Sequence, residues 1–231
     1  MNFDNIVYGR YYVGDSNFFF QISQTTIATW IVGGVLILLA IIARIKINNF
    51  KDVPETRFQK VIESLVEFFN KFTQGILTKE YSYFGGWFFG LFAFIAFSNI
   101  LGIFAPLRPP TADLATNVAM ATTTVILMWV AGIRHNGKEH FLDYFRPVPL
   151  FLPLNLLSDF SKIISLSVRL FGNIFSGIVI MSIIYMLLPW WASIGFPGGL
   201  SLYFDLFVGL LHAYVFVMLS MNFIYMKTPQ K

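Results

Sequence analysis

The 231-residue chain is 56% hydrophobic and only 12% charged, and it has no cysteine. Soluble domains carry about 25% charged residues, so this composition excludes an ordinary soluble domain and predicts an integral membrane protein without disulfides or thiolate metal sites. The formal net charge is +4, but the cations flank apolar segments, which is typical of membrane proteins and argues against nucleic-acid binding.

The chain is expected to form a single all-α membrane domain over residues 1–231. The N-terminal segment 1–24 lacks the basic start, apolar core and cleavage site of a secretory signal, so we expect it to be an external part of the mature protein. Four apolar stretches are each long enough to cross a bilayer, which takes about 20 helical residues. They cover residues 25–44, 83–104, 115–133 and 200–226.

A fifth apolar region, 148–188, is about twice as long as one membrane crossing requires. As a single helix its 41 residues would extend for about 60 Å at 1.5 Å per residue. The pattern of charged loops requires this region to cross an odd number of times, and one long, tilted helix satisfies that condition. The sequence therefore predicts about five crossings, with this long helix packed against the final one.

The placement of lysine and arginine predicts the orientation, because these residues accumulate in cytoplasmic loops. Seven cations lie between the first two spans, three lie in the loop before the long region, and two lie at the C-terminus. On the other side are only Arg10 and Arg108. We expect the N-terminus outside and the C-terminus in the cytoplasm, in a bacterial plasma membrane.

The segment 55–79 differs from the spans because charged residues separate its apolar residues, which recur at helical spacing. This pattern predicts an amphipathic helix along the cytoplasmic surface. It would act either as a surface anchor in lipid or as a docking surface for other subunits.

A polar stripe runs along the long apolar region. Its members are spaced by three or four residues, which places them on one face of a helix. They are Ser158, Lys162, Ser165, Arg169, Asn173 and Ser176. Asp159 precedes Lys162 by three positions and is close enough to neutralise it.

Arg169 has no acidic residue three or four positions away on either side. An arginine at the centre of a membrane helix costs about 2.5–3.5 kcal/mol on insertion scales, so something must offset it. Snorkelling is disfavoured because either end of the region is about twenty residues away. The alternatives are an ion pair with Asp205 in the same chain, or a carboxylate supplied by another chain, and a guanidinium remains charged in either case.

The final apolar segment carries Asp205 and His212 on one helical face, a combination that favours a proton or cation path. A metal site is not indicated, since His135 and His140 lie five positions apart in a loop, unlike the four-residue spacing of a zinc-binding helix. A phosphate-binding glycine loop is not recognisable either. No cofactor is expected.

The segment SLSVRLFGNIFSG at 165–177 closely resembles the a subunit of F-type ATP synthases, whose RLFGN core surrounds the essential membrane arginine. PTADLATNVAMA at 110–121 and LHAYVFVMLSMNFIYM at 211–226 resemble two further segments of that family. The resemblance implies that Arg169 is the essential arginine and Asn173 the motif asparagine. It also implies a basic residue at Lys162, an acid near the outer access route at Asp113 and one near the cytoplasmic route at Asp159.

The resemblance further implies ion translocation, by proton in preference to sodium, through two offset half-channels that Arg169 separates. The partners would be a rotating ring of c subunits, b-type subunits of the peripheral stalk and membrane lipid. Nucleotide chemistry would belong to other subunits. Three positions depart from the family: His212 stands where glutamine is usual, Ile178 where glutamate or histidine is common, and Asp205 where relatives have histidine or glutamate.

Three other functions are compatible with an apolar chain. A secondary transporter could bind an anionic solute at Arg169, although inverted repeats and broken midplane helices are not apparent. A membrane enzyme could use His135, His140 and His212 as a metal site, although topology separates them. A structural scaffold would leave the stripe around Arg169 unexplained.

Overall fold

The computed structural model describes residues 10–12, 21–47, 57–77, 79–104, 108–137, 142, 144–145, 149–188 and 196–228. Five helices within these ranges are long and apolar enough to cross a membrane. They cover Gln24–Ile47, Gly85–Gly102, Leu114–Asn136, Leu152–Leu187 and Leu206–Lys227. The prediction of an all-α integral membrane protein with about five crossings is confirmed.

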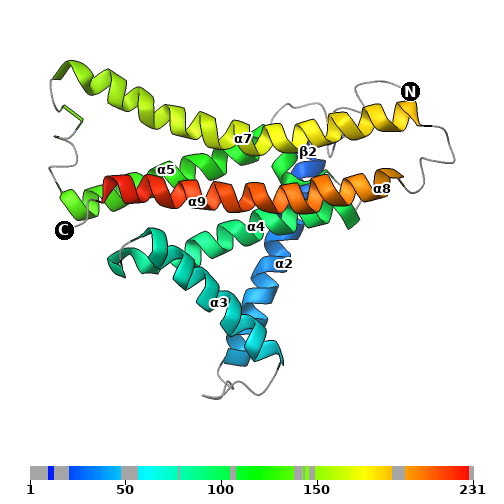
Figure 1. Cartoon of the computed structure of the whole chain (residues 1–231), viewed down its shortest axis with the longest axis horizontal. Helices are drawn as coiled ribbons and strands as arrows, with labels where there is room; N and C mark the ends of the chain where they lie inside the picture. Colours follow the sequence, from blue (N-terminus) through cyan, green and yellow to red (C-terminus); the bar gives the residue numbers. More distant parts are fainter. Residues whose placement is uncertain are drawn as a thin grey trace.

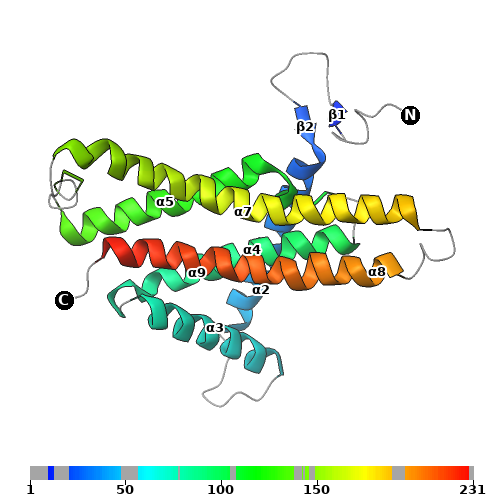
Figure 2. The ribbon, with the colours of Figure 1, turned by 45° about the horizontal axis from the view of Figure 1, so that its top comes forward.

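A short antiparallel strand pair precedes the first helix. Strand β1 (Arg10–Tyr12) pairs with β2 (Gln21–Ser23), and helix α2 (Gln24–Ile47) follows directly. Figures 1 and 2 show α2 crossing the other long helices at a steep angle. Apart from its contacts with α4 (Gly85–Phe104) and the 3-10 helix η2 (Pro110–Ala112), most of the α2 surface is exposed and apolar, as suits a helix surrounded by lipid.

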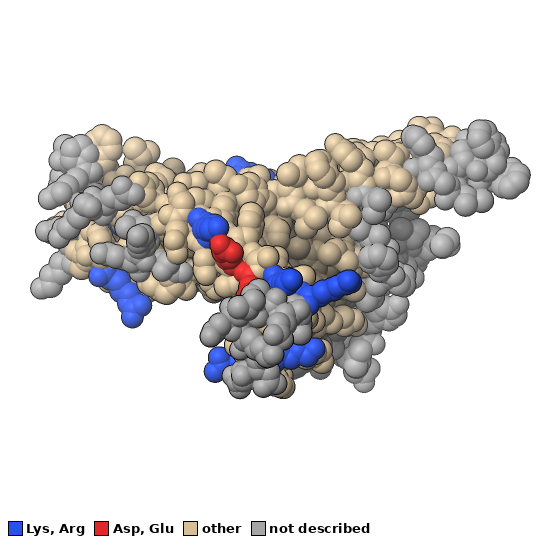
Figure 3. All heavy atoms as spheres, turned by 60° about the horizontal axis from the view of Figure 1, so that its bottom comes forward, with Lys and Arg blue, Asp and Glu red and all other residues tan. Residues whose placement is uncertain are grey.

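Helix α3 (Arg57–Ile76) is amphipathic and is not among the candidate spans. Aromatic side chains near its C-terminal end pack on the bundle, since the ring of Phe69 lies 4.9 Å from that of Phe89 and the ring of Phe72 lies 5.2 Å from that of Tyr214. Other apolar side chains of α3, including Phe58 and Phe68, are exposed. Figure 3 shows the face of the molecule on which lysine and arginine side chains gather around α2 and α3.

The 3-10 helix η1 (Lys79–Phe84) leads into α4 (Gly85–Phe104), and η2 (Pro110–Ala112) leads into α5 (Leu114–Asn136). Asp113 is the N-cap of α5, because its Oδ1 accepts a hydrogen bond from the backbone N–H of Ala115 at 3.1 Å. Gly137 ends α5 with a positive φ of 54°, a conformation that glycine adopts without steric cost. These end residues define the length of the helix.

The 3-10 helix η3 (Pro149–Phe151) precedes α7 (Leu152–Leu187), which is one uninterrupted helix of 36 residues. Pro153 lies in its first turn, where the missing N–H costs no helical hydrogen bond. At 1.5 Å per residue α7 is about 54 Å long, so the long region forms one helix rather than two. It runs alongside the C-terminal helix, as Figures 1 and 2 both show.

The C-terminal helical segment has three parts, unlike the single helix predicted over 200–226. Helix α8 (Phe196–Ser201) continues into a π-helical segment, η4 (Leu202–Val208), and then into α9 (Gly209–Lys227). Gly209, directly after the π turns, packs against the side chain of Asn99 in α4. Such turns depend on tertiary packing of this kind, which a hydropathy pattern does not record.

Helices α4, α5, α7 and α9 enclose the apolar core. Its largest fully buried side chains are aromatic or long aliphatic groups, and each of the four helices contributes to them. They include Phe88, Ile95, Met128, Leu166, Leu170 and Phe216. Helix α7 is therefore held from one side and exposes the other.

Candidate functional site

The polar stripe of α7 lies partly on the exposed side of the helix. Ser158, Ser165 and Arg169 are exposed, whereas Lys162 and Asn173 are half-buried. No ion pair or hydrogen bond reaches the guanidinium of Arg169 from the part of the chain that the structure describes. A fixed cation therefore stands on the open face of a membrane helix, available to a partner.

Asp205 lies within the π-helical segment η4, but its side chain is outside the described residues. The sequence left Asp205 as one of two possible partners for Arg169. The structure does not describe whether these two side chains are in contact. His140 also lies outside the described residues.

Asp159 and Lys162 form the local ion pair that their spacing predicts. Nζ of Lys162 lies 2.7 Å from Oδ1 of Asp159, and Asp159 is only 2% exposed. Lys162 also lies 5.4 Å from the ring centroid of Phe223 in α9. Because burial raises the cost of an unpaired charge, each of these two ions depends on the other.

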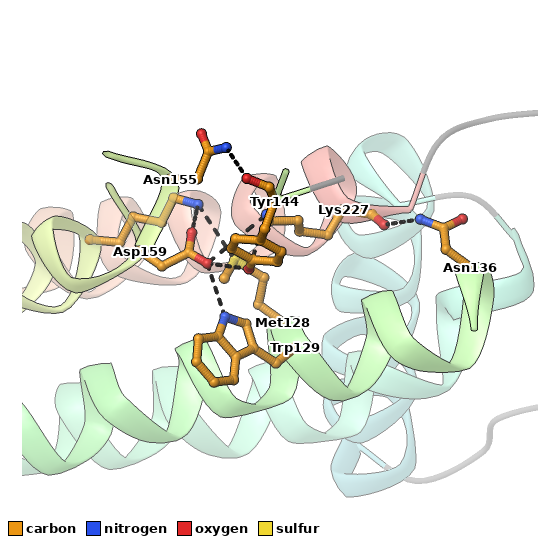
Figure 4. Close-up of polar contacts among 8 residues, drawn as sticks. Met128, Trp129, Asn136, Tyr144, Asn155, Asp159 and Lys227 are labelled. Atoms are coloured by element: carbon orange, nitrogen blue, oxygen red, sulfur yellow. Dashed lines mark hydrogen bonds and ion pairs between the residues drawn. The ribbon is translucent and has the colours of Figure 1, made fainter. Parts of the chain in front are cut away.

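Three further side chains surround the carboxylate of Asp159, and Figure 4 shows them converging on it. The indole N–H of Trp129 in α5 donates to Oδ2 at 3.0 Å, and the hydroxyl of Tyr144 donates to the same oxygen. Nζ of Lys227, at the end of α9, lies 4.0 Å from Oδ2 and 4.3 Å from the ring centroid of Tyr144. We call Trp129, Tyr144, Asp159, Lys162 and Lys227 the Asp159 cluster.

Asn173 lines a second polar feature, a cavity of ≈ 110 Å³ between α7, α4 and the C-terminal helical segment. Asn99 and Gly209 also line it, and Nδ2 of Asn99 is buried without a hydrogen-bond partner among the described residues. A buried amide of this kind is usually satisfied by water. The cavity is large enough for several water molecules.

A chain of hydrogen bonds joins Asn99 to the turn that carries Asp113. Oδ1 of Asn99 accepts from the hydroxyl of Thr111 at 3.0 Å, and the amide of Asn117 donates to the carbonyl of Thr111 at 2.8 Å. Asp113, two residues after Thr111, accepts from Thr25 at 3.3 Å while it caps α5. Asp113 thus stands at one end of a polar connection whose other end is the cavity beside Asn173.

His212 is half-buried in α9, and its Nδ1 lies 2.9 Å from the carbonyl oxygen of Val208, one turn earlier. Within the described residues His212 makes no polar contact with Arg169 or Asp113. His135 bonds elsewhere, with Nδ1 at 2.6 Å from the hydroxyl of Tyr81. Among the residues that the structure describes, no group of three or more His, Asp or Glu side chains could hold a metal ion.

Of the sequence-predicted residues, the structure thus joins Asp159 to Lys162 and places Asn173 on the cavity, while Asp113 and His212 occupy separate positions. Sequence reasoning missed Asn99, Trp129, Tyr144 and Lys227. A polar Asn99 in an otherwise apolar span was a signal for a functional or packing role. The other three are distant from Asp159 in the chain, and no local pattern indicates their convergence.

The chain is a multi-pass membrane protein with an exposed cation on one helix and a polar cavity beside that helix. These features are typical of the class of ion-translocating membrane subunits. The family model for the ATP synthase A chain matches residues 26–225. The chain belongs to this family, subunit a of the Fo sector of F-type ATP synthase. It is a component of that complex and takes part in ion translocation through the membrane.

Relatives in three organisms agree with this assignment. The sodium-ion-specific ATP synthase subunit a of Propionigenium modestum is 34% identical over 224 residues, covering 89% of this chain and 74% of the relative. ATP synthase subunit a 2 of Acaryochloris marina is 32% identical, covering 89% and 85%. Subunit a 1 of Crocosphaera subtropica is 31% identical, covering 96% and 91%. A secondary transporter that binds an anionic solute finds no support in these comparisons.

Proposed function

We propose that Arg169 is the fixed cation that separates two aqueous half-channels, against which a ring of c subunits carries the coupling ion. The observation that supports this proposal most directly is the exposure of Arg169 on α7 without a described counter-charge. A carboxylate on a moving partner can meet such a cation and then leave it. A carboxylate of the same chain would hold it permanently.

The outer half-channel follows the polar connection from Asp113 to the cavity at Asn173. Water in that cavity would hydrate an ion on its way to the ring, and Asp205 and His212 contribute from the C-terminal helical segment. The cytoplasmic half-channel opens along the part of α7 that carries Asp159 and Lys162. A ring carboxylate neutralised between the two can face lipid, because an uncharged group avoids most of the desolvation cost of an ion.

Residues 1–231 form one membrane domain, with the N-terminal side outside and the C-terminal side in the cytoplasm of a bacterial plasma membrane. Helix α3 lies along the cytoplasmic surface in contact with lipid, and b-type subunits of the peripheral stalk hold the chain against rotation. Nucleotide catalysis belongs to other subunits. Each unit charge that crosses a potential of 100 mV supplies about 2.3 kcal/mol, so several ions are needed for each ATP.

The Arg169→Gln substitution tests the central role. In membrane vesicles that contain the whole ATP synthase, we expect ion-driven ATP synthesis to be abolished, because the half-channels are no longer separated by a charge. Arg134→Gln, at an exposed arginine in the last turn of α5, is the matched control and should stay active. Near-normal coupling in Arg169→Gln would refute the proposal.

We propose the proton as the coupling ion, although one relative is named as sodium ion specific. The ligands that select the ion surround the ring carboxylate and are not in this chain. ATP synthesis should therefore respond to a proton gradient and cease when a protonophore is added. Synthesis that continues on a sodium gradient in the presence of the protonophore would show the opposite.

A further inference from the structure

The carboxylate of Asp159 is fully engaged by donors from the residues around it. Oδ1 accepts from Lys162 at 2.7 Å, and Oδ2 accepts from Trp129 at 3.0 Å and from Tyr144. A carboxylate has about four lone-pair positions. With Lys227 4.0 Å from Oδ2, little capacity remains on Asp159 for a further ligand.

The donors around Asp159 are themselves held in place. The backbone carbonyl of Tyr144 accepts from the amide of Asn155 at 2.9 Å, and the backbone carbonyl of Lys227 accepts from Asn136 at 3.3 Å. Burial, followed by the hydrogen bond to Asp159, raises the pKa of Tyr144 well above its usual value. The phenol therefore stays protonated and donates at every physiological pH.

An ion carrier must gain and lose its ion in each cycle. Neutralising Asp159 would leave the ammonium groups of Lys162 and Lys227, one 2.7 Å and the other 4.0 Å away, without their counter-charge in a largely buried place. Breaking a buried pair in this way is strongly unfavourable. The arrangement suits a permanent anion and disfavours one that titrates.

We propose that Asp159 is a fixed counter-ion that positions α7 and is not a carrier in the ion path, and that Trp129, Tyr144 and Lys227 are further positioning residues for translocation. The Asp159 cluster joins α5, the turn at 144–145 and the end of α9 to one point of α7. Arg169 lies ten residues further along α7, about 15 Å at 1.5 Å per residue. A helix held at Asp159 cannot slide or rotate, so the cluster sets the height and direction of Arg169.

This inference rests on the proposed role of Arg169, and a double-mutant cycle in the whole ATP synthase tests it. In membrane vesicles, Asp159→Asn should lower ATP-driven ion pumping by about tenfold or more, because it leaves Lys162 unpaired. The double variant Asp159→Asn with Lys162→Gln removes both charges and should be at least about tenfold more active than Asp159→Asn alone. A carrier carboxylate could not be replaced in this way, so a double variant no more active than the single would overturn the proposal.

Tyr144→Phe provides a second measurement, because it keeps the carboxylate and removes one donor. We expect pumping to fall by about threefold with an unchanged pH profile, because Asp159 loses one donor and keeps those from Lys162 and Trp129. A wild-type rate would overturn the positioning role of Tyr144, and a shifted pH profile would indicate that the cluster titrates. Assembly of each variant is quantified from the subunit content of the purified complex.

Two reference variants complete the experiment. Lys71→Gln breaks an exposed helical ion pair of the same 2.7 Å length, Lys71 with Glu67, and should leave pumping unchanged. Arg169→Gln in the same vesicles separates the two proposals. If it is inactive while the double variant is not rescued, only the positioning role fails; if it remains coupled, the proposed function fails.

Discussion

Lys162 and Arg169 are two cations on the same face of the same helix, two turns apart, and their surroundings are opposite. Lys162 is half-buried and bound to Asp159 at 2.7 Å, whereas Arg169 is exposed and has no described counter-charge. The apolar character of α7 does not distinguish the two positions. The difference arises from what packs on each part of the helix, since α5 and α9 supply donors around Asp159 and leave the face at Arg169 open.

The comparison shows that one helix can carry both a fixed ion pair and a cation that is exposed to a partner. Around Asp159 every charge has a partner within the chain, so this region contributes rigidity. Around Arg169 the described residues supply no counter-charge. In the proposed mechanism this charge comes from a moving partner and is therefore free to change. The comparison is wrong if a permanent partner for Arg169 leaves ATP synthesis unchanged. It is strengthened if a looser packing near Arg169 lowers coupling in part.

Short of removing Arg169 itself, the largest effect is expected from Ser165→Asp. Ser165 is exposed one turn before Arg169, and an aspartate four residues before an arginine forms a helical ion pair. Arg169 would then resemble Lys162, and ion-driven ATP synthesis in vesicles should fall by about tenfold or more, since an ion pair is stronger in the low dielectric of the membrane than in water. Ser165→Asn, which has a similar shape and no charge, should retain most of the activity. Equal rates for the two variants would contradict the need for an unpaired arginine.

A smaller effect is expected from Gly209→Ala, because Gly209 lines the cavity beside Asn173. A Cβ at Gly209 would lie 2.7 Å from Nδ2 and 3.3 Å from Cβ of Asn99, so the Asn99 side chain or the two helices would have to shift. Overpacking of this kind costs about 1–3 kcal/mol, and we expect a lower thermal stability of the purified complex with partial loss of coupling. In Gly90→Ala the added carbon has nothing within 4 Å, and this control should match the wild type. A stable Gly209→Ala complex would show that the contact is not tight.

The sequence predicts the parts of this structure that depend on local patterns. Continuous apolar stretches predict the five membrane helices, and the three-residue spacing predicts the pairing of Lys162 with Asp159. The absence of a nearby acid singles out Arg169. These properties depend on residues within one or two helical turns of each other, and the spacing of residues in the sequence is enough to predict them.

The remaining features depend on the packing of distant segments. Trp129 and Tyr144 lie 30 and 15 residues from Asp159. The packing of α5 on α7 brings Trp129 to its carboxylate, and the turn at 144–145 brings Tyr144. The π-helical turns of η4 and the contact of Asn99 with Gly209 likewise arise where two helices meet. Local sequence patterns within one helix do not predict contacts between helices. The Asp159 cluster and the cavity at Asn173 therefore follow only from the three-dimensional structure.

The contact of His212 with its own helix gives the imidazole a direction. A backbone carbonyl can only accept, so the ring nitrogen that lies 2.9 Å from the oxygen of Val208 has to carry a hydrogen. This selects one tautomer of the neutral ring and leaves Nε2 as its only lone pair. The neutral ring then has a single hydrogen-bond acceptor, at Nε2, while its one donor is committed to the backbone of its own helix.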